Sequence, residues 1–294
     1  MRVRFLSRGG VLARLVGDAR VVQQVLAVVC GGFTIRGMRR FGIFLIVLLA
    51  VAGGGAWYFR DRLAGLWRSG PPAMVPAEVK LVPDPESYAV LVGDLKRWRG
   101  ELAVSYAATR DPEKRAEIER DARVLLELAL PEMMRCWLGT PWDFHGTAAV
   151  PGGGKIACGY FVSTVLMDAG FKVDRYLLAK QPSENILRTF LSREDCELTV
   201  GRPYEEFADD AARLLPGVYV VGLDTHVAFL VVPEGGAFRF IHSSGSKPWC
   251  VVDESRENAE VLRKSKWRML GNLTADAGVV RQWLSGKVIP VRGA

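Results

Sequence analysis

The spacing of apolar residues predicts that the first half of this chain contains helices. Residues 86–130 carry an apolar stripe at helical spacing, and Asp111-Pro112 predicts that the stretch breaks into two helices. Another helix is predicted over 158–169, with Gly170 as its stop signal. Its apolar face is formed by Phe161, Val162, Val165, Leu166 and Ala169.

Helical spacing also recurs on both sides of the predicted strands. Residues 183–215 predict two helices, and Ser183 is a candidate N-cap for the first of them. Residues 255–286 predict a return to helix, with Trp267 and Trp283 as packing anchors.

Three short apolar runs predict the core strands, at 217–222, 226–232 and 237–242. Glu234-Gly-Gly236 is typical of a tight turn, so the last two runs predict an antiparallel hairpin. His226 and His242 would then lie near the same end of adjacent strands. The fold class predicted is α+β, with the helix at 158–169 packed on a small antiparallel sheet.

Cys158 opens that helix and is the candidate nucleophile. A cysteine attacks as the thiolate, and the partial positive charge and free N–H groups of a helix N-terminus favour that anion. The backbone N–H of Cys158 could also stabilise an oxyanion. The alternative is a small buried cysteine without a chemical role.

The three histidines supply candidates for the remaining roles. His226 follows Gly222-Leu-Asp-Thr225 at the start of a strand and is the candidate general base. His242 would fix the tautomer and orientation of that base. Each has a structural alternative: His226 satisfied by a nearby carbonyl, His242 as a polar strand end. His145 lies in a predicted loop, and either contacts substrate or is loop structure.

Two other chemistries are weighed and disfavoured. Cysteine and histidine together are zinc ligands, but the chain has neither an H-E-x-x-H motif nor a C-x-x-C pair, and no metal or cofactor is predicted. Gly152-Gly-Gly-Lys155 is not a phosphate-binding loop, because Pro151 precedes it and Ile156 follows the lysine.

Taken in order, these residues resemble the NlpC/P60 superfamily of bacterial cell-wall cysteine peptidases, which are papain-like hydrolases. Gly139-Thr-Pro-Trp142-Asp-Phe-His-Gly146 is similar to the family's loop, and Ala157-Cys158-Gly159-Tyr160 to its nucleophile turn. His226 and His242 stand where the family has its base and third polar residue. The resemblance covers about residues 135–245.

The resemblance implies a Cys158–His226–His242 triad and a substrate side that includes Trp142, Asp143 and Tyr160. The sequence departs from the family pattern at three positions. Ala157 replaces Asp before the cysteine, Gly159 replaces Ser after it, and Trp142 replaces a Tyr and so offers no hydroxyl. The stretch between the cysteine and the base also contains the helical insert at 183–215.

The net charge of +7 belongs to the N-terminus rather than to a nucleic-acid surface. Residues 1–40 contain eight arginines and one acidic residue, whereas the remaining 254 residues carry equal numbers of basic and acidic groups. No nucleic-acid motif is present, so no nucleic-acid partner is predicted.

An uncharged apolar run, Phe41–Phe59, follows the basic segment. Its 19 residues, at ~1.5 Å rise each, nearly span a ~30 Å hydrocarbon core. The preceding arginines predict a cytoplasmic N-terminus and an extracytoplasmic (periplasmic) catalytic domain on the inner membrane. The alternative is a signal peptide cleaved at Ala50-Val-Ala52, which would release a secreted protein. The layout also suggests Met38 as the true start.

The domain organisation predicted is a basic segment at 1–40, a transmembrane anchor or signal at 41–59, a linker at 60–85, a helical accessory segment at 86–130 and the hydrolase domain at 131–294. The cysteines at 30, 136, 158, 196 and 250 show no disulfide spacing framework, and a pair among 136, 196 and 250 stays open.

The function expected is membrane-anchored thiol hydrolysis of an amide bond, with peptidoglycan peptides as the substrate that the resemblance and the topology imply. Two alternatives remain. A catalytically silent tethered scaffold could bind wall peptides or a partner in the same groove, and an acyltransferase could pass the same thioester to an amine or lipid.

Overall fold

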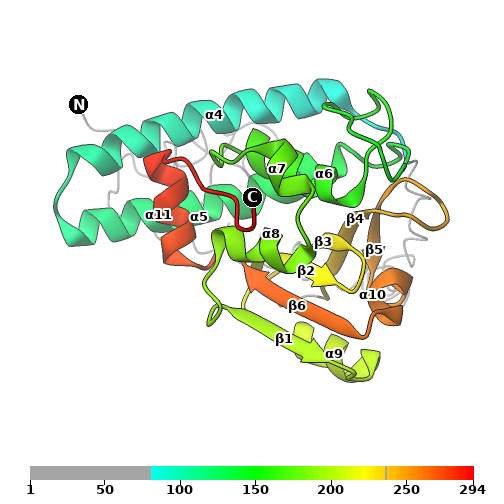
Figure 1. The fold of residues 1–294 in the computed structure, drawn as a ribbon. Helices are drawn as coiled ribbons and strands as arrows, with labels where there is room; N and C mark the ends of the chain where they lie inside the picture. Colours follow the sequence, from blue (N-terminus) through cyan, green and yellow to red (C-terminus); the bar gives the residue numbers. More distant parts are fainter. Residues whose placement is uncertain (1–80, 236) are drawn as a thin grey trace, which may run out of the picture. The chain divides into compact units, whose positions relative to one another are not determined.

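The computed structural model describes residues 81–235 and 237–294 (Figure 1). The basic segment 1–40, the apolar run 41–59 and residues 60–80 of the linker lie outside these residues, as do Met38 and the Ala50-Val-Ala52 site. Within the described ranges, no helix has the length and apolarity that crossing a membrane requires.

The fold is α+β and is built on one antiparallel sheet of six strands in the order β1-β6-β2-β3-β4-β5. The strands are β1 Cys196–Val200, β2 Gly217–Leu223, β3 Val227–Val232, β4 Arg239–Ser243, β5 Val251–Ser255 and β6 Trp267–Asn272. The predicted hairpin is confirmed, because β3 pairs with β4 and Phe229 lies opposite Ile241.

Helices cover both faces of the sheet. They are α4 Pro85–Ala108, α5 Pro112–Arg135, α6 Cys158–Asp168, α7 Arg175–Ala179, α8 Ser183–Phe190, α9 Tyr204–Ala211, α10 Glu260–Lys264 and α11 Ala277–Ser285. One core packs α4, α5, α6, α8 and α11 on the sheet face of Val227, Phe229 and Ile241. A second core packs α9 and α10 on the face of Ala228, Leu230 and Phe240.

The break predicted at Asp111-Pro112 separates α4 from α5. Asp111 caps α5, because its carboxylate accepts a hydrogen bond from the backbone N–H of Glu113, and Pro112 occupies the first turn, where no N–H partner is needed. The two helices pack against each other and against α11. Trp283 of α11 anchors this contact, since it is buried and its carbonyl accepts from Nε of Arg99 in α4. Its indole N–H donates to the carbonyl of Ala169 at the end of α6.

The two helices predicted in 183–215 are confirmed as α8 and α9, and the helix predicted in 255–286 is present as α10 and α11, but each region also contains a strand. In 183–215, β1 separates α8 from α9; it is an edge strand whose Leu198 and Val200 are exposed, so no alternating buried face marks it. In 255–286, Trp267 begins β6 rather than anchoring a helix. Arg268 is buried in that strand and donates to three backbone carbonyls, so a charged residue interrupts the apolar pattern.

Ser183 is not the N-cap of α8. Pro182 is the capping residue, and Ser183 is the first residue of the helix. Its hydroxyl donates to the carbonyl of Leu223 at the end of β2, 3.1 Å away. The side chain therefore ties α8 to the turn that precedes His226.

Candidate active site

Cys158 is the first residue of α6, as predicted. Ala157 caps the helix in an extended conformation and has no side-chain capping bond, so the N-terminal N–H groups of α6 remain available to an anion. Gly159 follows because α7 passes close by. A Cβ on Gly159 would lie 2.3 Å from the carbonyl oxygen of Ala179, so a residue with a side chain does not fit at this position.

The segment before the nucleophile is a hydrogen-bonded loop. The N–H of Ala157 donates to the carbonyl of Gly146, and that of Ile156 donates to the carbonyl of Pro141, both at 2.9 Å. Ser243 at the end of β4 donates to the carbonyl of Ile156 at 2.7 Å. These bonds fix the loop, the nucleophile turn and the histidine hairpin relative to one another.

His226 is placed by the turn between β2 and β3. The N–H of Leu223 donates to the carbonyl of His226 at 2.8 Å, which closes a tight turn. Asp224 in that turn accepts hydrogen bonds from Ser265 and from the backbone N–H of Lys266. His226 therefore stands immediately before β3, half-buried, at the end of the hairpin that also carries His242.

The two imidazoles are in direct contact. Nε2 of His226 lies 2.8 Å from Nδ1 of His242, and the rings meet edge to face. His242 is completely buried, and its Nε2 lies 3.1 Å from Oε2 of Glu254 on β5. The three side chains form a hydrogen-bonded row across β3, β4 and β5. Sequence reasoning predicted the histidine pair and missed Glu254.

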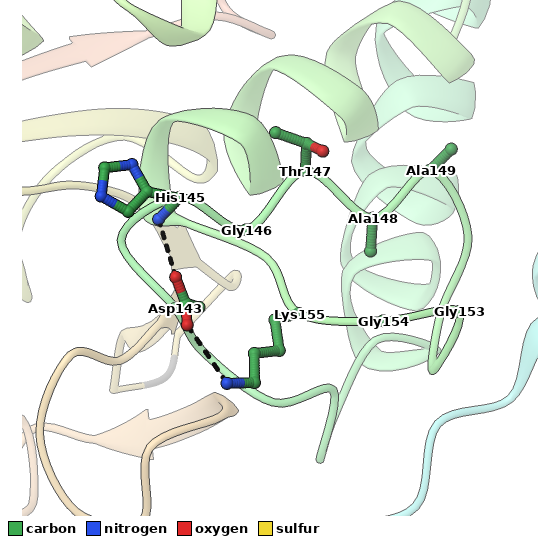
Figure 2. A pocket seen from close by; sticks show the side chains of 9 residues that line it. All are labelled: Asp143, His145, Gly146, Thr147, Ala148, Ala149, Gly153, Gly154 and Lys155. Carbon is green, nitrogen blue, oxygen red and sulfur yellow. Dashed lines mark hydrogen bonds and ion pairs between the residues drawn. The ribbon is translucent and has the colours of Figure 1, made fainter.

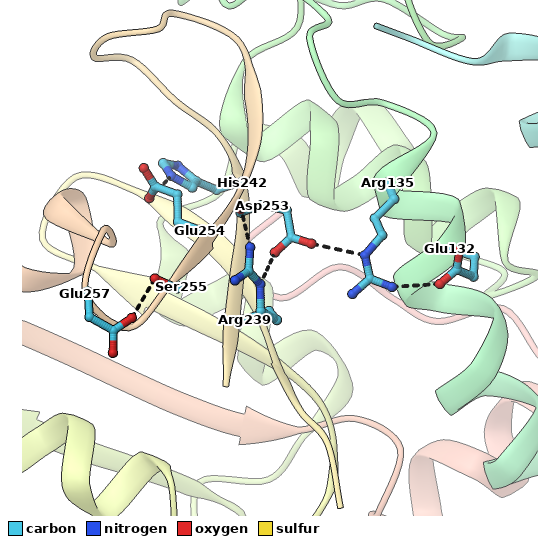
Figure 3. A network of polar contacts seen from close by, with 8 residues as sticks. All are labelled: Glu132, Arg135, Arg239, His242, Asp253, Glu254, Ser255 and Glu257. Carbon is cyan, nitrogen blue, oxygen red and sulfur yellow. Dashed lines mark hydrogen bonds and ion pairs between the residues drawn. The ribbon is translucent and has the colours of Figure 1, made fainter. Parts of the chain in front are cut away.

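The position of Glu254 follows from strand alternation. In the β4–β5 register, His242 is opposite Val252, so Glu254 is its diagonal neighbour on the same face. Figure 3 shows Glu254 beside His242, while Asp253 points toward Arg239 and Arg135 on the opposite side of the strand. The sequence of β5 is two valines followed by three polar residues, which does not alternate, and no strand was predicted over 251–255.

Burial shapes the electrostatics of the row. It lowers the pKa of His226 well below its usual value, with His242 adding to the effect, and lowers the pKa of His242 to about 3. Both imidazoles are therefore neutral at pH 7. Burial, and then the nearby charge of Glu260, raises the pKa of Glu254 to about 7.

Burial also raises the pKa of the Cys158 thiol. The backbone N–H groups of Val227, Gly159 and Cys158 act in the opposite direction but do not outweigh it. The helix N-terminus alone therefore does not produce the thiolate that the sequence predicts. Within the described residues, no hydrogen bond joins the sulfur of Cys158 to the imidazole of His226, so a proton transfer between them would require the two groups to approach each other.

Cys158 and His226 line the same cleft, which has a volume of about 690 Å³. Trp142 and Tyr160 also line it, so the structure brings two of the three predicted substrate residues into one cleft with Cys158. His145 lies at its rim and is exposed. The lining is mostly aromatic and aliphatic, with Lys180 as its charged residue among those described.

Asp143 lies outside this cleft. It lines an adjacent, shallower pocket with Gly153, Gly154 and Lys155 (Figure 2). Its carboxylate accepts from the backbone N–H of His145 and pairs with Lys155 at 3.1 Å, and these contacts lower its pKa. Asp143 thus stabilises the loop through this hydrogen bond and through its ion pair with Lys155, the lysine that follows the glycine run.

Trp142 is held in place by the segment after β4. Its ring lies 5.5 Å from that of Trp249, centroid to centroid, and a Cβ on Gly245 would lie 3.0 Å from it. Because position 245 is glycine, no side chain there collides with the indole of Trp142 at the cleft. Trp142 lines the cleft, and Trp249, which is half exposed, packs against it from outside the lining.

In residues 81–235 and 237–294, no three His, Cys, Asp or Glu side chains are grouped so that they could hold a metal ion. Cys136, Cys158, Cys196 and Cys250 are all free thiols. Comparison with known proteins adds no identification: no family model, no curated protein and no solved structure matches this chain.

Proposed function

We propose that this protein is a thiol hydrolase that cleaves an amide bond through Cys158, His226 and His242. The observation that supports it most directly is the shared cleft: a cysteine at a helix N-terminus and a histidine face the same cavity, and the second ring nitrogen of that histidine is held 2.8 Å from a buried histidine. Nucleophile, base and orienting group are the three parts that such a reaction needs.

In the proposed reaction, the sulfur of Cys158 attacks the amide carbonyl while its proton passes to Nδ1 of His226. Nε2 is the ring nitrogen that contacts His242, so Nδ1 is the one free for the thiol. The imidazolium then returns the proton to the leaving amine, and a thioester forms as the C–N bond breaks. Water, activated by the same imidazole, hydrolyses the thioester to the acid.

The oxyanion would be stabilised by backbone N–H groups at the start of α6. Those of Cys158 and Gly159 already favour negative charge at the sulfur, and the helix places them at the cleft. The indole of Trp142, which lines the cleft and packs against Trp249, would contact the substrate beside the scissile bond.

Two further parts of the proposal come from the sequence. The resemblance to NlpC/P60 peptidases and to their papain-like fold suggests peptidoglycan peptides as substrate. The arginine-rich start followed by Phe41–Phe59 suggests a membrane anchor that holds the domain outside the cytoplasm.

Thiol reactivity tests the proposal without knowledge of the substrate. The full chain, kept in mild detergent, is treated briefly with iodoacetamide from pH 5 to pH 8, and labelled sites are mapped by mass spectrometry. We expect Cys158 to label faster than a model thiol, and the label at that position to disappear in Cys158→Ser. Purified peptidoglycan is then incubated with wild type and Cys158→Ser, and released amino groups are measured.

The opposite outcome has a defined meaning. If Cys158 labels no faster than a model thiol and His226→Ala leaves its rate unchanged, the hydrolase proposal fails and a binding scaffold is favoured. A reactive Cys158 that transfers an acyl group to an added amine in preference to water would favour the acyltransferase.

A further inference from the structure

We propose that Glu254 is a positioning residue of this site: through the buried imidazole of His242, it sets which ring nitrogen of His226 carries the proton. The inference deepens the proposed function and rests on it for its chemical consequence. The hydrogen-bond geometry that supports it is independent of any reaction.

Both ring nitrogens of His242 lie within hydrogen-bonding distance of another side chain. Nδ1 contacts Nε2 of His226 at 2.8 Å, Nε2 contacts Oε2 of Glu254 at 3.1 Å, and the ring is completely buried. A neutral imidazole has one donor and one acceptor nitrogen. Whether Glu254 accepts from Nε2 of His242 or donates to it therefore determines whether Nδ1 of His242 accepts or donates.

When Glu254 is ionised, the hydrogen bonds among Glu254, His242 and His226 run in the direction that the proposed reaction needs. A carboxylate can only accept, so Nε2 of His242 carries the proton and donates to it. Nδ1 of His242 then accepts from the Nε2–H of His226. Nδ1 of His226 is left with a free lone pair, ready to take the thiol proton of Cys158.

When Glu254 is protonated, the donor and acceptor at each of these hydrogen bonds change places. Its O–H donates to Nε2 of His242, whose Nδ1–H donates to Nε2 of His226. The hydrogen of His226 then sits on Nδ1, which cannot accept a proton from Cys158. One proton on Glu254 thus decides whether His226 can act as a base, without either histidine becoming charged.

The charges around Glu254, on both sides of the strand, make this proton exchange accessible near neutrality. Glu260 on α10 and Asp253 on β5 disfavour its carboxylate, and Arg239 on β4 favours it, while His242 on β4 is neutral. With burial as the largest cause, the pKa of Glu254 rises to about 7. By contrast Asp253 is engaged by two arginines, Arg135 and Arg239, on the other side of the strand (Figure 3).

Nitrogen NMR of the full chain, labelled selectively with ¹⁵N-histidine, tests the proposal. The sequence contains only three histidines, and His145→Ala identifies the exposed one. In wild type we expect Nδ1 of His226 to be unprotonated at pH 8.5 and protonated at pH 5.5, with a midpoint near pH 7 shared by His242. Glu254→Gln should abolish this midpoint, because an amide has no proton to lose in this range.

Glu257→Gln is the matched control, since Glu257 is exposed, lies three residues further along and bonds to Ser255 instead. It should retain the wild-type midpoint. If the histidine tautomers stay fixed from pH 5.5 to pH 8.5 in wild type, or if Glu254→Gln keeps the same transition, the positioning role of Glu254 is wrong.

Iodoacetamide labelling separates this inference from the proposed function. Glutamine can donate as well as accept at Nε2 of His242, so it no longer fixes the direction of the hydrogen bonds. At pH 8 we therefore expect Glu254→Gln to slow labelling of Cys158 about tenfold, and Glu257→Gln to change it less than twofold. Fast labelling in wild type that is unchanged in Glu254→Gln would overturn the positioning role and leave the hydrolase proposal standing. Slow labelling in wild type would overturn the hydrolase proposal, while the tautomer shift would still decide the role of Glu254.

Discussion

At the scale of the residue, Cys158 and His226 are each kept neutral by burial. Burial penalises a lone thiolate and a lone imidazolium separately. A proton that moves from the thiol to the imidazole creates both charges together and leaves the pair without net charge. The reactivity of Cys158 should therefore depend on the base, more than on the helix N-terminus.

This argument predicts the effect of removing the base. We expect His226→Ala to slow alkylation of Cys158 at pH 7 by about 100-fold, within the usual contribution of a general base. His145→Ala is the matched control, because His145 lines the same cleft but is exposed, and it should change the rate less than twofold. Equal rates in the two variants would argue against the pair.

Gly159 permits a second prediction. A side chain there would meet the carbonyl of Ala179 at 2.3 Å, and neither backbone can move without shifting α6 or α7. We expect Gly159→Ala to lower the free energy of unfolding by about 1–3 kcal/mol. Urea denaturation measures this. Gly93→Ala on the exposed face of α4, where nothing lies within 4 Å of the added methyl, should be neutral or stabilising.

Local pattern located several site residues and could not locate Glu254. Cys158 and His242 stand at element ends that apolar spacing and turn residues define. Glu254 lies twelve residues beyond His242, and its role depends on which strand pairs with β4. That pairing is a long-range property, which the residues around Glu254 do not encode.

At the scale of the element, the hairpin and α6 were predictable for the same reason. Each has a regular apolar face, and glycine marks the end of α6 at Gly170 and the hairpin turn at 235–236. β1 and β6 lack this signal, since one exposes its apolar residues at the sheet edge and the other buries Arg268. Both strands depend on contacts with residues distant in the chain, so neither can be recognised from its own sequence.

Arg175 joins three elements around the nucleophile. Its buried guanidinium donates to Thr164 of α6 and to the carbonyls of Thr147 and Ala148 in the loop, and it stacks on Tyr160. We expect Arg175→Lys to cost about 1–3 kcal/mol of unfolding free energy, because one ammonium cannot satisfy all these acceptors.

Hydrogen exchange would show whether the loss is local. The backbone amides of Ala148 and Ala157, which donate within the 140–157 loop, should exchange faster in Arg175→Lys. Arg110→Lys changes an exposed arginine at the end of α4 in the same way and should leave both amides and the stability unchanged. Loop amides that exchange at the wild-type rate in Arg175→Lys would contradict this role.

At the scale of the whole molecule, the buried row makes stability depend on pH. The pKa values of His226 and His242 are lowered by burial, so the unfolded chain binds more protons at these positions below about pH 6.5. Their contribution to stability is complete above that pH and is lost as pH falls toward about 3 for His242. Glu254, whose pKa is raised to about 7, acts oppositely between about pH 4.5 and 7.

We therefore expect the free energy of unfolding to fall below pH 6.5, and to fall more steeply below about pH 4.5, where Glu254 is protonated in both states. Urea titrations from pH 3.5 to pH 8 measure the slope. His242→Gln should flatten it, whereas His145→Gln should not. A slope that His242→Gln leaves unchanged would show that other groups cause the acid instability.

The hydrogen bonds around the cleft also have a practical consequence. Cys158 and His226, the proposed nucleophile and base, come from segments far apart in the chain, and the folded structure brings them to one cavity. If the pair activates the thiol, an unfolded or misassembled molecule carries an ordinary cysteine at position 158. The fraction of Cys158 that is labelled rapidly would then equal the fraction of correctly folded molecules in a preparation. Labelling of Cys158 could therefore be used to measure how much of the purified protein is correctly folded.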